Sequence, residues 1–158
     1  MKWYEDPVYI KMAEKAVEIQ KLFPKEKLLE DRREFGEHES LFERWNGSWF
    51  VINDDIELFH LDNDTDKWMI GCSYGGNEYY EEDVRKSIWL PDQSQLQGMV
   101  KDKFIDFREM HLRFCQWLGM DSLQDYFRTL SSMEQLWLAF DHKELYGKVW
   151  NREDWIPL

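Results

Sequence analysis

Alternating carboxylates in the segment Asp62-Asn63-Asp64-Thr65-Asp66 come closest to a recognised chemistry in this chain. Oxygen atoms at alternate loop positions can surround a hard cation such as Ca²⁺. The segment departs from a calcium-binding EF-hand loop, because Lys67 stands where glycine is needed and Ser73 where a bidentate glutamate is needed. A solvated hairpin turn is therefore favoured, since Asp and Asn side chains cap their own backbone in turns. The candidate metal ligands are Asp62, Asp64 and Asp66.

The sequence lacks the common catalytic and nucleotide-binding motifs, among them GxSxG, the Walker A loop, GxGxxG and HExxH. Asp141-x-Lys143 weakly resembles an acid-x-Lys nuclease pair, but that pair normally lies on a strand, and this one falls in a predicted helix. Cys72 and Cys115 lie far apart, which predicts two reduced, partly buried thiols. We therefore predict a protein that is not an enzyme, with no catalytic residues and no cofactor.

The net charge of −12 is concentrated in the middle of the chain. Residues 51–98 carry 3 basic and 11 acidic side chains, and so −8, whereas residues 1–50 and 99–158 carry −2 each. Such a surface repels phosphate, which argues against direct nucleic-acid binding, and attracts a cation or a basic protein surface. The acids predicted to contact such a partner are Asp54, Asp55, Glu57, Glu81, Glu82 and Asp83.

Two helical regions are predicted to flank the acidic segment. In the first, Asp6 is the N-cap, Pro7 begins a helix and Pro24 ends it. Its predicted apolar face contains Ile10, Ala13, Val17 and Leu22. The second region begins with the cap Asp92, and is one long helix, or two with a break near residues 101–103, ending at Gly119.

A final helix is predicted between Ser131 and Gly147. Ser131 and Glu134 have the spacing of a capping box, and Gly147 stands where a left-handed residue ends a helix. The predicted apolar face contains Met133, Leu136, Trp137 and Phe140.

The acidic segment itself has the alternation of antiparallel strands. The predicted strands are Ser48 to Ile52, Ile56 to Leu61 and Lys67 to Tyr74, with a fourth beginning at Tyr79 and Tyr80. Asn53-Asp54-Asp55 is the predicted turn between the first two strands. The sequence therefore predicts a single α+β domain over residues 1–158, with an N-terminal helix, a central antiparallel β-meander and a C-terminal helical layer.

Two stretches of the chain are similar to a known family. Ser132-Met133-Glu134-Gln135-Leu136-Trp137-Leu138-Ala139-Phe140, with Lys148-Val149-Trp150-Asn151 and Glu153-Asp154-Trp155-Ile156, resembles the C-terminus of uncharacterised phage and prophage proteins of Gram-positive bacteria. Ile88-Trp89-Leu90-Pro91 and the following Gln95-Leu96-Gln97 resemble a Trp-Leu-Pro…Gln-Leu-Gln segment of the same family. The resemblance covers less than half of the chain and brings no catalytic residues. It implies the cytoplasm of a bacterial host.

The favoured hypothesis is a non-enzymatic phage or prophage accessory protein that binds a basic protein surface through its acidic sheet. Two alternatives stay open at this point. The first is a divalent-metal-binding protein or metal-assisted hydrolase that uses the central carboxylates, and the second is a self-associating structural component of a phage assembly. No apolar run reaches the roughly 18 residues of a membrane span, so no membrane partner is expected.

Overall fold

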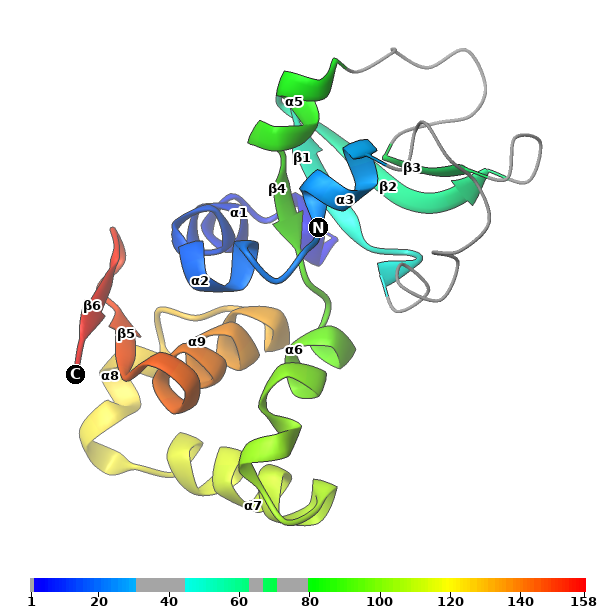
Figure 1. The fold of residues 1–158 in the computed structure, drawn as a ribbon. Helices are drawn as coiled ribbons and strands as arrows, with labels where there is room; N and C mark the ends of the chain where they lie inside the picture. The colour runs from blue at the N-terminus through cyan, green and yellow to red at the C-terminus, as the bar shows by residue number, and fades with distance from the viewer. Residues whose placement is uncertain (1, 31–44, 63–66, 71–79) are drawn as a thin grey trace. The chain divides into compact units, whose positions relative to one another are not determined.

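The computed structural model describes residues 2–30, 45–62, 67–70 and 80–158 (Figure 1). The described chain combines helices with antiparallel strands, which confirms the predicted α+β class. It forms two compact units. Unit 1 joins Met1–Ala16 to Pro91–Leu158, and unit 2 is Val17–Leu90, which lies between those two segments in sequence.

Unit 1 combines helices with a C-terminal hairpin. Its elements are η1 (Trp3–Glu5), α1 (Pro7–Lys15), α6 (Gln93–Val100), η3 (Lys101–Lys103), α7 (Phe107–Leu118), η4 (Asp121–Leu123), α8 (Gln124–Phe127), α9 (Met133–Tyr146), β5 (Lys148–Trp150) and β6 (Trp155–Pro157). Of the two arrangements predicted after Asp92, the structure has two helices, because η3 interrupts the run between α6 and α7.

The start of α1 is as predicted, but its end and its buried face are not. The Asp6 carboxylate accepts a hydrogen bond from the Val8 N–H at 2.9 Å, as an N-cap does. The helix ends at Ala16, where ψ is 60°, well before Pro24. The expected face is wrong at Val17 and Leu22, which are 53% and 41% exposed. The buried positions of α1 are Tyr9, Met12 and Ala13.

Helix α9 is capped one residue later than predicted. Ser132, not Ser131, is the N-cap, and its hydroxyl accepts from the Gln135 N–H at 3.1 Å. The Gln135 side chain completes the cap, because its Oε1 accepts from the Ser131 N–H at 2.8 Å. The buried Gln135 amide also donates to Asp6 at 2.7 Å, which links α9 to the start of α1.

The predicted left-handed end of α9 is confirmed, since Gly147 has φ of 62°. A Cβ at this position would meet no atom within 4 Å, so Gly147→Ala carries only the conformational cost of a positive φ. We expect a loss of about 1 kcal/mol of stability. Gly98→Ala is the matched control, because Gly98 lies inside α6, also with open space, and should gain about 0.5–1 kcal/mol. Urea unfolding of both variants measures the difference in sign.

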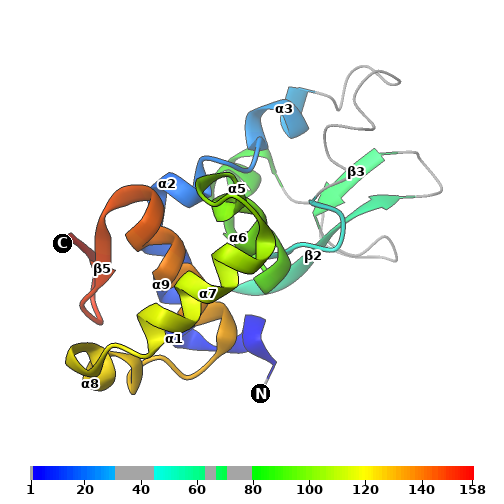
Figure 2. The same ribbon diagram turned by 90° about the horizontal axis from the view of Figure 1, so that it is seen from below.

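Helix α9 occupies the centre of unit 1, where it contacts α1, α6 and β5 (Figures 1 and 2). Every residue from Trp137 to His142 is buried, so this helix has no single apolar face, and the predicted face member Met133 is 42% exposed. Helix α7 packs onto α9 through Phe114, whose ring stacks on that of Trp137 with 3.9 Å between the ring centroids. The predicted partly buried thiol of Cys115, on the same helix, is exposed instead.

The tail after α9 forms the hairpin β5–β6, which the sequence reading did not include. Trp155 anchors it, because its indole N–H donates to the Met12 carbonyl at 3.0 Å and its ring stacks on His142 at 3.9 Å. The Tyr9 hydroxyl donates to the Pro91 carbonyl just ahead of α6. Residues from both ends of the chain therefore complete the core of unit 1.

Unit 2 contains a four-stranded antiparallel sheet in the order β3-β2-β1-β4. Its described elements are α2 (Val17–Gln20), α3 (Lys25–Glu30), β1 (Trp49–Ile52), β2 (Asp55–Asp62), β3 (Lys67–Ile70), α5 (Glu81–Lys86) and β4 (Ile88–Leu90). The predicted turn between β1 and β2 is confirmed. Asn53 and Asp54 both have positive φ, 50° and 67°, as a two-residue hairpin of type I′ requires.

The fourth strand is not where the sequence placed it. Tyr80 is the N-cap of α5, and the strand is β4, which pairs with β1. On the other edge of β4, the Gln20 side chain forms hydrogen bonds with the backbone. Gln20 accepts from the Trp89 N–H and donates to the Trp89 carbonyl, both at 2.8 Å. The core of the unit centres on Phe23, whose ring contacts the rings of Trp45, Phe50, Phe59 and Trp89.

Candidate functional site

The predicted partner-binding acids gather at one end of the sheet of unit 2. Asp54 and Asp55 form and follow the tight turn between β1 and β2, and both are exposed. The pair of β1 and β4 nearest this turn is Val51 with Ile88, so helix α5, which leads into β4, reaches the sheet at the same end. We call the four exposed carboxylates here, Asp54, Asp55, Glu81 and Glu82, the acidic end.

Two of the predicted contact residues do not belong to this exposed set. Glu57 is half-buried, because it lies opposite Phe50 in the β1–β2 register and so shares the sheet face that carries Phe50 and Phe59. Asp83 is half-buried as well, and its carboxylate accepts from the Tyr80 N–H at 3.0 Å in the cap of α5. Glu57 therefore lies outside the exposed set, and the Asp83 carboxylate caps α5.

The charges of the acidic end are not equally available. Glu81 lies 3.5 Å from Arg85 and Glu82 lies 3.0 Å from Lys86, both as pairs one helical turn apart. Such surface pairs stabilise a helix by only about 0.3–0.5 kcal/mol, but each places a cation beside its carboxylate. In the part of the chain that the structure describes, Asp54 and Asp55 have no ion pair. The hairpin thus supplies the uncompensated negative charge.

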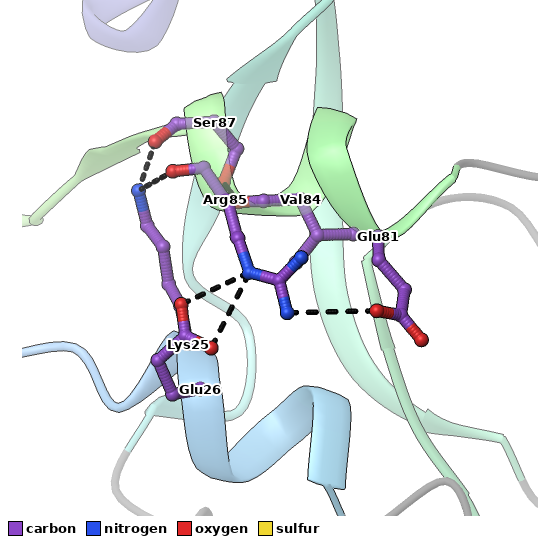
Figure 3. Close-up of polar contacts among 6 residues, drawn as sticks. All are labelled: Lys25, Glu26, Glu81, Val84, Arg85 and Ser87. Atoms are coloured by element: carbon purple, nitrogen blue, oxygen red, sulfur yellow. Dashed lines mark hydrogen bonds and ion pairs between the residues drawn. The ribbon is translucent and has the colours of Figure 1, made fainter.

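A network between α3 and α5 holds the helical half of the acidic end (Figure 3). The Arg85 guanidinium approaches both oxygens of Glu26, with Nε 3.2 Å from Oε1 and 3.3 Å from Oε2. The Ser87 hydroxyl donates to the Val84 carbonyl at 2.7 Å in the last turn of α5. We call Lys25, Glu26, Glu81, Arg85 and Ser87 the α3–α5 clamp.

Lys25 closes this clamp at the C-terminal end of α5. Its amine donates to the Ser87 carbonyl, and to the Arg85 carbonyl at 3.4 Å (Figure 3). A cation is favoured there, because the last carbonyls of a helix carry partial negative charge. The side chain is half-buried, and the loss of hydration lowers the pKa of Lys25 to about 8. Sequence reasoning missed this residue, because its partners lie some 60 positions away.

The lowered pKa predicts a pH dependence that Lys25→Met should remove. Unfolded lysine holds its proton up to about pH 10.4. Between pH 8 and 10.4 the unfolded chain therefore binds more protons than the folded chain, and the stability contributed by this group rises with pH. We expect the wild type to gain stability relative to Lys25→Met across this window, as measured by urea unfolding at each pH. A constant difference between the two proteins would contradict the assignment.

The side chains of the three predicted metal ligands all lie outside the described part of the chain. Asp64 and Asp66 lie outside the described residues, and Asp62 ends β2 with a side chain that is also outside the description. Among the residues that are described, no group of three His, Cys, Asp or Glu side chains could hold an ion. In the same residues, no helix has both the length and the apolar character to cross a bilayer.

Among the described residues, the carboxyl whose pKa is shifted most strongly lies elsewhere, in unit 1. Asp141, on α9, is fully buried, and neither of its oxygens has a hydrogen-bond partner among the described residues. Burial raises the pKa of Asp141 well above its ordinary value. The only sequence signal at this position was the Asp141-x-Lys143 spacing, which gave no indication of burial.

No protein-family model, curated protein or solved structure matches this chain.

Proposed function

We propose that this chain is a phage or prophage accessory protein that acts without catalysis, by binding a basic surface of another protein through the acidic end. The observation that supports the proposal best is the exposure of Asp54 and Asp55, unpaired among the described residues, on a tight turn. Unit 2 carries 9 basic and 18 acidic side chains, a net charge of −9.

The acidic end has properties that favour recognition of a cationic partner. The type I′ turn and the α3–α5 clamp fix its charges before a partner arrives, which reduces the entropy that binding must overcome. The wider field of unit 2 would draw the partner in, so that charge acts mainly on the association rate and on specificity. Binding should accordingly weaken steeply with salt.

The test is a capture experiment from a Gram-positive host lysate at low salt, with a double variant, Asp54→Asn and Asp55→Asn. Asparagine tolerates the positive φ at position 54, so the variant removes two charges and keeps the turn. The control is Asp102→Asn with Asp121→Asn, which removes the same charge from exposed positions of unit 1. We expect a basic protein that is held by wild type and by the control, is released by salt, and is lost by the variant.

Equal capture by the variant and the control would sink the proposal, because it would show that overall charge, or no charge at all, determines binding. Capture that resists salt would sink it as well.

A further inference from the structure

Lys25 has surroundings that differ from those of several other described lysines. Carboxylates lie within 4 Å of several lysine amines, namely those of Lys2, Lys11, Lys86 and Lys143. The Lys25 amine instead donates to two uncharged carbonyls, those of Arg85 and Ser87. The charged groups that face it from α3 and α5 are Glu26, Arg85 and Glu81, and these pair with one another.

Two carbonyl acceptors leave one direction of the amine unoccupied. A neutral amine has two N–H bonds and one lone pair. The two N–H bonds are directed at the Arg85 and Ser87 carbonyls, and no third partner contacts the nitrogen among the residues that the structure describes. The lone pair then points away from both acceptors. Once Lys25 loses its proton, the clamp therefore holds it with its nucleophilic electron pair free.

We propose that Lys25 is a modification site, at which the amine is acylated by activated donors of the acyl phosphate or thioester class. The lone pair of Nζ attacks the carbonyl carbon and forms the N–C bond. The bond from that carbon to the phosphate oxygen or thiol sulfur breaks, and the leaving group takes the electron pair. Nitrogen gives up its proton to water, so the product is a neutral amide.

The population of the reactive form supports this chemistry. With a pKa of about 8, roughly a quarter of the Lys25 amines are neutral at pH 7.5, against about 0.1% for an ordinary lysine. Acylation would also change the clamp, because an amide keeps one N–H and loses the positive charge. One carbonyl at the end of α5 would lose its donor, which would loosen the helical half of the acidic end.

The experiment treats the native chain with acetyl phosphate at low conversion, from pH 6.5 to 10. Digestion after glutamate yields a peptide that contains both Lys21 and Lys25, and fragment spectra separate the two. Lys21 is exposed and serves as the internal reference. At pH 7.5 we expect Lys25 to react at least ~10-fold faster than Lys21. Its rate should level off above pH 8, while that of Lys21 keeps rising.

The same reaction in denaturing urea separates the fold from local sequence. There the advantage of Lys25 should vanish, because the clamp is gone. Equal rates at the two lysines in the native chain would overturn the proposal. So would an advantage that survives in urea, since it would then come from the neighbouring residues and not from the α3–α5 clamp. A Lys25→Arg variant should lose most of the acetyl groups that the peptide containing Lys21 gains at pH 7.5, and unchanged acetylation of that peptide would likewise overturn the proposal.

Discussion

Replacing Asp141 with asparagine is expected to stabilise unit 1 at neutral pH and to remove a steep pH dependence. Asp141 is fully buried in α9, and no described residue forms a hydrogen bond with either of its oxygens. Its pKa is raised well above the ordinary value because burial penalises the charged form. Asparagine has nearly the same shape and cannot ionise. The folded variant therefore avoids both the cost of burying a charge and the cost of holding a proton on it.

The direction of this pH dependence follows from proton linkage. The unfolded chain releases this proton near pH 4, whereas the folded chain retains it to higher pH. Across that window the folded state binds more protons, so wild-type stability falls as pH rises, by up to about 1.4 kcal/mol per pH unit. The two proteins should have similar free energies of unfolding near pH 3. From pH 4 upward the variant should become increasingly more stable than the wild type, until the pKa of Asp141 in the folded chain is passed.

Urea unfolding followed by far-ultraviolet circular dichroism, repeated at each pH, measures this difference. Asp102→Asn is the control, because Asp102 is exposed on η3 of the same unit. Its profile should follow that of the wild type. Parallel profiles for Asp141→Asn and the wild type would show that Asp141 ionises freely in the folded chain.

Truncation of Phe140 to alanine is expected to be the most damaging change in the core of unit 1. Phe140 is fully buried, and its ring contacts those of Phe104, Phe114, Trp117 and Trp137. Because aromatic neighbours surround it on several sides, the cavity cannot collapse easily. We expect a loss of about 3–5 kcal/mol of stability.

Met133→Ala is the matched control for that truncation. Met133 lies on the same helix and on the same predicted face, but its side chain is 42% exposed. Its loss should stay within roughly 1 kcal/mol. Urea unfolding of the two variants decides the matter. Similar losses for both would mean that the face predicted from the helical period is correct after all.

Signals that depend on neighbouring residues were predictable from the sequence. The caps formed by Asp6 and Asp92, the left-handed Gly147 and the turn at Asn53 and Asp54 each rest on one or two side chains and the backbone beside them. The acids of the hairpin were identified for the same reason. The half-burial of Glu57 could not be predicted, because its face depends on its register against Phe50, which composition does not reveal.

Features that depend on distant residues could not be predicted. Strand β4 has only three residues, too few for an alternating pattern to predict it. It is held by its pairing with β1 and by its hydrogen bonds with Gln20. The lowered pKa of Lys25 arises from burial beside α5, some 60 positions away. The burial of Asp141 follows from the central position of α9, in which every residue from Trp137 to His142 is buried. An amphipathic pattern misleads for such a helix, because polar residues are buried with the rest.

Unit 1 is built from two segments that are separated in sequence by the whole of unit 2, and this affects the order in which the two units can fold during synthesis. Residues 17–90 emerge as a complete unit, whereas α1 must wait for α9 and for Trp155, whose indole N–H bonds to the Met12 carbonyl. During synthesis α1 therefore remains without its partners until most of the chain has been translated. Contacts between residues so far apart in sequence, such as Met12 and Trp155, form slowly. A nascent chain stalled before residue 133 would present an intact sheet with an unprotected leading helix, a natural target for chaperones or proteases.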